Sequence, residues 1–245
     1  MSTAKTRSPF SGFAGRIIDR SRKTLAVAAV LLFGTVAAGV YETDFGEGKW
    51  DPSEWQMVKT SRSGYIGQWI QHRDKLVNKV PDGTDPKNFT TSACDTFTSM
   101  LLKKDFSGDV TVELVCGFEA RMAPGIVISA LPLRPGEKSV AELPIHLEIV
   151  LYDNGLNVWY HFFENGKQKW HKVVHFMERN VFAPGKPHRV TFRIVTRKGL
   201  RFAEVSCGGK TAGGLLPPDF PKTFRIGIVA SEGVNFFHSI KITTP

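Results

Sequence analysis

The chain has 245 residues, enough for one large domain or two small ones. Its formal net charge of +9 is concentrated at the N-terminus, where residues 1–23 hold six Lys or Arg side chains against a single Asp. The rest of the chain has no basic run interleaved with aromatic residues, which argues against nucleic-acid binding. It also lacks P-loop, GxGxxG and GxSxG motifs, so we expect no nucleotide site.

The first 41 residues predict export. An apolar run without charged residues extends from Leu25 to Tyr41, and its length of about 17 residues lies at the lower limit for a membrane-spanning helix. Small residues at Val36-Ala37-Ala38 also suit a signal-peptide cleavage site. Residues 24–41 are therefore either a cleaved signal peptide or a single-pass anchor. In both cases the positive-inside rule leaves residues 1–23 in the cytoplasm and exports residues 42–245, which stay at the cell membrane or are released as a secreted or periplasmic domain.

The three cysteines, Cys94, Cys116 and Cys207, allow at most one internal disulfide, and a Cys94–Cys207 pair is one option. Cys116 shares its alternation phase with neighbouring apolar residues, which predicts a buried small side chain. The absence of CxxC pairs and Cys/His clusters in the sequence predicts no metal site. Calcium at Asp153-Asn154-Gly155 stays an alternative, although a turn explains all three residues.

Short strands are predicted along the first half of residues 42–245. One strand is expected around Trp55–Val58, and Trp69 to Val80 suits either a helix or two strands around Arg73-Asp74. Residues 81–92 have the composition of a loop. Further alternating runs predict strands at Thr96–Lys103, Asp109–Arg121 and Gly125–Ala130.

The second half predicts strand after strand with short turns between them. Asp153-Asn154-Gly155 and Glu164-Asn165-Gly166 are Asn-Gly turns between β-branched and aromatic runs, the strongest short-range hairpin signal. The expected strands are Leu147–Tyr152, Leu156–Phe163, Lys172–Phe176, His188–Val195, Arg201–Cys207, Thr223–Ala230 and Phe236–Ile242. About ten antiparallel strands without convincing helices predict an all-β fold, a two-sheet jelly-roll sandwich or a barrel.

Three segments resemble concanavalin A-like sandwiches of sugar-handling bacterial proteins. Trp69 to Asn78 looks like their W-x-x-x-D-G-x-L opening, Thr96 to Val110 like the next two strands, and Phe224 to Ile242 like the closing strands. The resemblance covers roughly residues 50–245 and is nearest to the 3-keto-disaccharide hydrolase-like domains, with lectin and laminin-G-like modules next. It implies a jelly-roll sandwich that binds carbohydrate on its concave sheet face.

One departure from that family argues against classical glucanase activity. Retaining glucanases of the superfamily carry a Glu-x-Asp-x-x-Glu strand, whereas in this chain Glu148 and Asp153 are five residues apart and on opposite phases. Alternation cannot place both carboxylates in one groove, as retaining chemistry needs.

The hairpin from His146 to Phe163 holds the candidate site. Leu147, Ile149 and Leu151 should face the core, so the other phase should face the groove, with Glu148 and Tyr152 on the first strand and Asn157, Trp159 and His161 on the second. Aromatic rings stack on sugar C–H faces while polar groups bind hydroxyls, which makes Tyr152, Trp159 and Asn157 candidate ligand-binding residues. Arg121, with Glu119, could complete the same groove.

Three classes of function follow from this hairpin. A carbohydrate-binding module needs only the aromatic and polar face. A glycoside-processing hydrolase would use Glu148 and His161 as an acid–base pair. A non-catalytic envelope interaction protein needs neither, because Trp159 and Tyr152 could pack under a loop while Glu148 and His161 form an ordinary cross-strand pair.

Overall fold

The computed structural model describes residues 39–61, 65–85, 96–119, 123–132, 140–152, 155–177 and 182–245. Residues 36–245 form one compact unit, which contains every described strand. Several predicted features lie outside the described residues: the basic segment 1–23, most of the apolar segment 24–41, Cys94, Arg121 and the Asp153-Asn154 pair. Within the described part of the chain, no helix has the length and apolar character needed to cross a bilayer.

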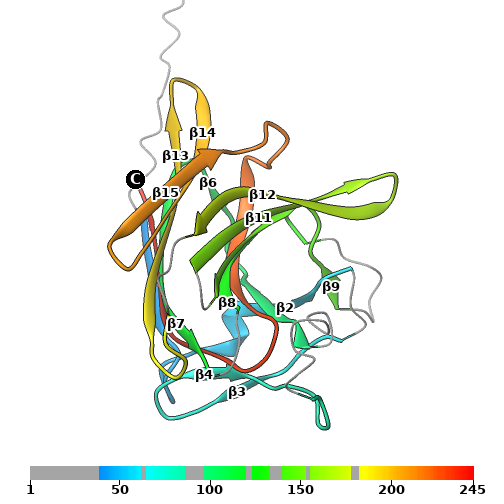
Figure 1. The fold of residues 1–245 in the computed structure, drawn as a ribbon, viewed down its shortest axis with the longest axis vertical. Helices are drawn as coiled ribbons and strands as arrows, with labels where there is room; N and C mark the ends of the chain where they lie inside the picture. The colour runs from blue at the N-terminus through cyan, green and yellow to red at the C-terminus, as the bar shows by residue number, and fades with distance from the viewer. Residues whose placement is uncertain are drawn as a thin grey trace, which may run out of the picture. The chain divides into compact units, whose positions relative to one another are not determined.

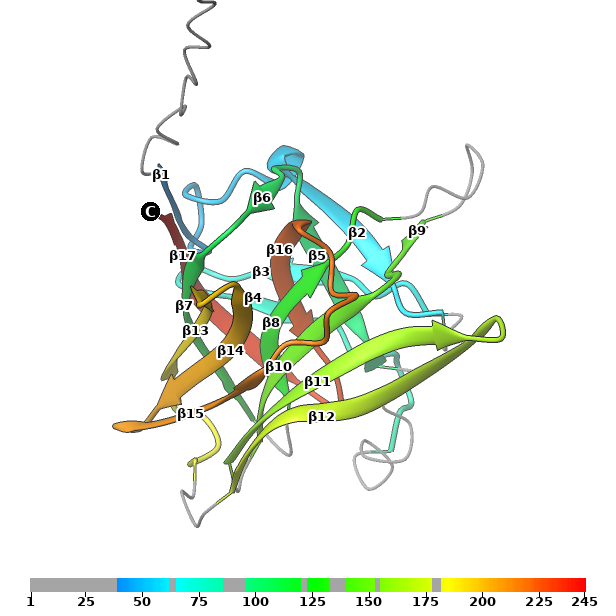
Figure 2. The ribbon, with the colours of Figure 1, turned by 90° about the horizontal axis from the view of Figure 1, so that it is seen from above.

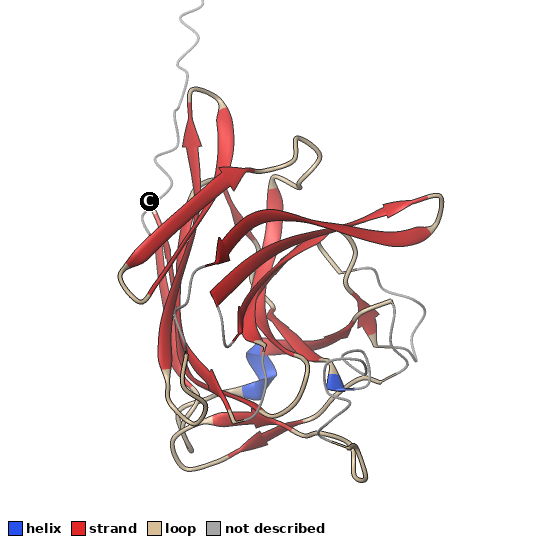
Figure 3. Cartoon of the chain, in the orientation of Figure 1, coloured by secondary structure: helices blue, strands red, loops and turns tan. Residues whose placement is uncertain are grey.

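The unit is a two-sheet β-sandwich with almost no helix among its described residues (Figure 3). The first sheet has the order β15-β14-β13-β7-β17-β4-β3, with β1 also paired to β17 (Figure 1). Its strands are β1 (Gly39–Asp44), β3 (Trp69–Gln71), β4 (Leu76–Asn78), β7 (Val110–Phe118), β13 (His188–Arg197), β14 (Leu200–Cys207), β15 (Lys210–Leu215) and β17 (Asn235–Thr244).

The second sheet has the order β12-β11-β10-β8-β16-β5-β2-β9, with β6 also paired to β16. Its strands are β2 (Trp55–Lys59), β5 (Thr98–Leu102), β6 (Phe106–Ser107), β8 (Pro124–Ser129), β9 (Ala141–Glu142), β10 (His146–Tyr152), β11 (Gly155–Glu164), β12 (Lys167–Met177) and β16 (Thr223–Ala230). A short 3-10 turn, η1 (Pro52–Glu54), precedes β2. Figure 2 shows the long β11–β12 hairpin along one edge of this sheet. The predicted antiparallel jelly-roll sandwich is confirmed, apart from the N-terminal helix, which lies outside the described residues.

Two-residue turns set the register of the hairpins. Asn165 and Gly166 both have positive φ, at 52° and 73°, and connect β11 to β12. Positive φ at both central residues defines the type I′ turn, whose twist matches that of the flanking strands. The predicted Asn-Gly turn at residues 164–166 is therefore confirmed.

The ambiguous segment from Trp69 to Val80 forms two strands, β3 and β4, and no helix. The backbone N–H of His72 donates to the carbonyl of Lys75 (2.8 Å) in the turn between them. The indole of Trp69 meets Phe237 of β17 edge to face, with ring centroids 5.4 Å apart. The local pattern of this segment suited both a helix and two strands, and contacts with the distant strand β17 stabilise the two strands.

Some strands have no clear signal in the sequence. β1 begins at Gly39, so the last three residues of the apolar run belong to a strand that pairs with β17. β15, with the sequence KTAGGL, pairs with β14 at the edge of the first sheet. Glycine and lysine are depleted in strands, so pairing with a neighbour outweighs local preference in this segment.

The main core lies between the sheets, and the predicted alternation of β7 is confirmed. Val112, Leu114 and Cys116 are fully buried, whereas Thr111 and Glu113 are only partly covered. A second, smaller apolar cluster covers the face of the second sheet that points away from the core, called the outer face below. It consists of Val58, Phe97, Leu101, Ala123, Val127, Ala141, Leu143, Val150 and Val229. The middle of the outer face is therefore buried, and the β10–β12 edge of this face carries polar side chains.

Candidate functional site

The register of β10 and β11 builds the candidate site. Glu148 lies opposite Trp159, and His146 lies opposite His161. Leu147, Ile149 and Leu151 belong to the main core, so these four side chains, which have the other phase, lie on the outer face. The same register places Asn157 opposite Val150 on that face, and Tyr152, half-buried, at the end of β10.

Three of these residues form a buried group, called the His–Glu–His cluster: His146, Glu148 and His161. Their exposed fractions are 0%, 7% and 3%. Glu148 Oε1 lies 3.2 Å from His146 Nε2, and Oε2 lies 3.3 Å from His161 Nε2. The two imidazoles are stacked, with ring centroids 4.4 Å apart and planes 3° from parallel. One carboxylate thus bridges two stacked rings below the surface.

Hydrogen bonding at His146 determines how protons are distributed in the cluster. Its Nδ1 lies 2.6 Å from the carbonyl oxygen of Pro144, which only accepts, so Nδ1 carries the proton. Its Nε2 faces a carboxylate oxygen, also an acceptor when ionised. His161 Nε2 is within ion-pair distance of Glu148, but neither ring nitrogen of His161 has an aligned hydrogen-bond partner among the described residues.

The electrostatics of the cluster favour an ionised carboxylate. Burial by itself raises the pKa of Glu148, but the adjacent imidazoles of His161 and His146 outweigh it and hold that pKa well below its usual range. Burial lowers the pKa of His146, and the contact with Glu148 opposes this only in part. The cluster is therefore a buried anion between two imidazoles.

The outer face continues into a group of half-buried and exposed aromatic and polar side chains, called the hairpin patch: Asn157, Trp159, Trp170, Lys172 and His175. His175 Nδ1 lies 2.6 Å from Asn157 Oδ1, and Lys172 Nζ lies over the ring of Trp159, 5.1 Å from its centroid. Trp170 is 49% exposed, and its ring stacks on His161 with centroids 6.3 Å apart. The patch thus lies directly beside the buried cluster.

The structure divides the predicted site residues into different environments. Trp159 and Asn157 belong to the accessible hairpin patch, whereas Glu148 and His161 are buried beside it. Glu119 is exposed and follows β7, which pairs with β13 and β17 in the first sheet, and its place in their groove stays a prediction. Its predicted companion Arg121 lies outside the described residues.

Four functional candidates were not selected from the sequence: His146, Trp170, Lys172 and His175. His146 has the same phase as Glu148, but only the strand register shows that it stacks on His161. The β12 residues alternate with the correct period, yet an irregularity in the pairing at Val158/Trp159 changes which of them face outward. The predicted strand begins at Lys172, and a tryptophan just before a strand more often caps a core than binds a ligand, whereas β12 begins at Lys167 and places Trp170 opposite His161.

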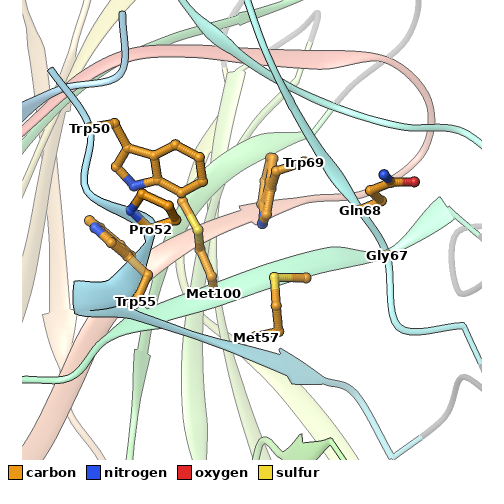
Figure 4. Close-up of a pocket in the computed structure, with 8 residues that line it drawn as sticks. All are labelled: Trp50, Pro52, Trp55, Met57, Gly67, Gln68, Trp69 and Met100. Atoms are coloured by element: carbon orange, nitrogen blue, oxygen red, sulfur yellow. The ribbon is translucent and has the colours of Figure 1, made fainter. Parts of the chain in front are cut away.

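A separate apolar pocket of about 290 Å³ lies between the sheets, beneath β2 and β5 and next to β3. Its lining includes three tryptophans and two methionines: Trp50, Trp55, Trp69, Met57 and Met100. Figure 4 shows these side chains turned toward a common space, while Gln68 points away from it. No charged side chain among the described residues lines the pocket, and most of its lining is apolar.

Comparison with known proteins identifies the fold class. No family model matches this chain, and no curated protein matches it in sequence. Among solved structures, the β-porphyranase BpGH16B from the human gut bacterium Bacteroides plebeius is similar, with a TM-score of 0.52, 10% identity, and coverage of 84% of this chain and 92% of that one. A GlcNAcα1-4Gal-releasing endo-β-galactosidase from Clostridium perfringens has a TM-score of 0.52 and 6% identity over 86% of this chain and 63% of that one.

A carbohydrate-binding module, CBM66 from Bacillus subtilis, has a TM-score of 0.46 and 10% identity over 76% of this chain and 92% of that one. The chain has the fold of the concanavalin A-like lectin and glucanase sandwiches, as the resemblance in its sequence predicted. At these identities the similarity concerns the fold alone, and the site has to be argued from its own residues.

Proposed function

We propose that this protein binds carbohydrate through the hairpin patch on the outer face of its second sheet. The observation that carries the proposal is the pair of indoles on this face, Trp159 half-buried and Trp170 49% exposed, surrounded by Asn157, Lys172 and His175. The names of two structural neighbours, a porphyranase and an endo-β-galactosidase, are consistent with this use of the sandwich.

The chemistry of the patch suits a sugar ring. An exposed indole offers an apolar face for the C–H groups of a pyranose, and this stacking gains from removing both surfaces from water. Asn157 and His175 hold each other in place through a 2.6 Å contact and offer polar atoms to hydroxyl groups. Lys172 adds a positive charge, which favours neutral or acidic sugars over cationic ones.

Binding is favoured over hydrolysis by the burial of the candidate acid–base pair. A catalytic carboxyl has to come within hydrogen-bond distance of the glycosidic oxygen. Glu148 and His161 are 7% and 3% exposed, and both are engaged with each other. They support the patch from below, whereas Trp159 and Trp170 would contact the ligand.

Export of the sandwich is part of the proposal. It is supported by the six basic residues of segment 1–23 followed by the uncharged run from Leu25 to Tyr41. An exported sandwich, either held at the membrane or released after cleavage, would meet polysaccharides of the envelope or the surroundings.

The full chain, purified in a mild detergent, is tested on an array of polysaccharides and oligosaccharides, 3-keto-glycosides included. We expect selective binding that Trp170→Ala weakens about tenfold or more, a loss of at least 1.4 kcal/mol of binding free energy. Leu200→Ala, an exposed apolar residue of the first sheet (53% exposed), is the matched control and should bind as the wild type does. The proposal would be refuted if the folded protein bound nothing on the array. It would also be refuted if binding survived both Trp159→Ala and Trp170→Ala.

A further inference from the structure

We propose that the His–Glu–His cluster binds one divalent transition-metal ion, with Zn²⁺ the first choice, through His146 Nε2, His161 Nε2 and a Glu148 carboxylate oxygen. This site goes beyond carbohydrate binding and does not depend on it. It also revises the expectation, drawn from cysteine and histidine spacing, that the chain has no metal site.

The first argument is the arrangement of the three ligand atoms. They come from neighbouring strands and all lie within 4.8 Å of one another. His146 Nε2 lies 3.2 Å from Glu148 Oε1, and His161 Nε2 lies 3.3 Å from Glu148 Oε2. Zinc bonds of 2.0–2.1 Å in a tetrahedron place neighbouring ligand atoms about 3.4 Å apart, so each nitrogen already lies at about this distance from one oxygen of the same carboxylate.

The second argument is the orientation of His146. Its Nδ1–H donates to the carbonyl oxygen of Pro144 (2.6 Å), the outer hydrogen bond by which metal-binding histidines are usually held. This bond leaves the Nε2 lone pair of the neutral ring pointing at a Glu148 oxygen. Two acceptors that face each other require a cation between them, and a metal ion there bonds to both.

The third argument is the charge balance of the site. Among the described residues, the ion-pair partners of Glu148 are His146 and His161, and no Lys or Arg contacts it. A buried carboxylate is costly unless it is paired, and a divalent ion would add to the positive charge that the two imidazoles supply. The ring nitrogens of His161 also have no aligned hydrogen-bond partner in the described part of the chain, which leaves one of them available as a ligand.

The chemistry of the ligands selects the metal. Two imidazoles and one carboxylate suit Zn²⁺ and its neighbours among the transition metals, whereas Ca²⁺ and Mg²⁺ prefer oxygen ligands. Three protein ligands leave at least one coordination position for water or a ligand atom. His146 is already held with Nε2 toward Glu148, and because the two rings are parallel, ion binding requires the His161 ring to turn until its Nε2 lone pair points at the same ion. A bound ion would then link β10 to β11 directly beneath Trp170 of the hairpin patch.

The experiment is a metal titration of the full chain, free of any histidine tag and stripped with a chelator. Competition with a chromophoric chelator measures the Kd for Zn²⁺, and Ca²⁺ is titrated in parallel. We expect one Zn²⁺ per chain and no comparable Ca²⁺ binding. Glu148→Gln and His161→Asn should each raise the Kd for Zn²⁺ by more than about 100-fold, since even outer-shell changes cost 10- to 100-fold. His72→Ala, which changes an exposed histidine in the turn between β3 and β4 of the first sheet, should leave this Kd unchanged.

A second measurement keeps the proposal testable if a variant fails to fold. Co²⁺ added to the stripped wild type should give the intense visible bands of a low-coordinate ion bound by nitrogen and oxygen. The proposal is overturned if the wild-type protein neither binds Zn²⁺ stoichiometrically nor gives these bands. The cluster then holds a proton at the position assigned to the ion. The proposal is also overturned if the Glu148→Gln and His161→Asn variants are folded and still bind Zn²⁺ as the wild type does. Neither measurement contains a sugar, so failure of the carbohydrate proposal would be seen separately.

Discussion

Replacing Glu148 with glutamine tests how much the His–Glu–His cluster contributes to stability in the absence of metal. Glu148 is 7% exposed and its carboxylate lies 3.2 and 3.3 Å from two imidazole nitrogens. Removing one partner of a buried ion pair typically costs about 3–5 kcal/mol. Glutamine keeps the shape and one acceptor oxygen, so we expect Glu148→Gln to lower the free energy of unfolding by about 3 kcal/mol at pH 7.

The cost of Glu148→Gln should depend on pH in a defined direction. The pKa of Glu148 is lowered in the folded protein, whereas in the unfolded chain a glutamate titrates near about 4.3. Above that pH the carboxylate is ionised in both states and its full contribution is present. As the pH falls below about 4.3, the unfolded chain takes up the proton first, and the contribution is progressively lost. The difference between wild type and variant should therefore be constant near neutrality and shrink in acid.

Urea unfolding in a chelating buffer, followed by tryptophan fluorescence from pH 3.5 to 8, measures both effects. The matched control is Glu113→Gln, because Glu113 pairs with Arg189 on the surface, at side-chain exposures of 34% and 66%. An exposed pair contributes about 0–1 kcal/mol, so this variant should change little. Equal losses in the two variants, or a Glu148→Gln loss that persists unchanged below pH 4, would refute the electrostatic account of the cluster.

Two further predictions concern packing. A Cβ at Gly227 of β16 would overlap the backbone carbonyl oxygen of Met100, which cannot move aside. Gly227→Ala should therefore lower the free energy of unfolding in urea by about 1–3 kcal/mol or more. An unchanged unfolding midpoint would contradict this packing. Burial raises the pKa of the Cys116 thiol and raises that of Cys207 to about 11. In a Cys94→Ser background both thiols should therefore resist a thiol reagent at pH 8 and react only in urea, and rapid native labelling would contradict their burial.

The strands and their faces were predictable because their signals are local. Alternation in β7 correctly placed Val112, Leu114 and Cys116 on one face, and the Asn165-Gly166 pair set the β11–β12 turn. Where local signals were equivocal, the prediction stayed open. Trp69 to Val80 suited a helix as well as two strands, and contact with Phe237 of β17 decided for strands.

That Glu148 and His161 lie on the same face of one hairpin follows from local pattern, because alternation and a two-residue connection dictate phase. How deeply the two side chains are buried depends on the packing of the whole fold. The fold placed Glu119 just beyond the end of β7 in the first sheet, and the second apolar cluster covered the middle of the outer face. Depth and sheet membership depend on which distant segments pair and pack. That choice follows from the total area buried by the whole chain, and no local pattern encodes it.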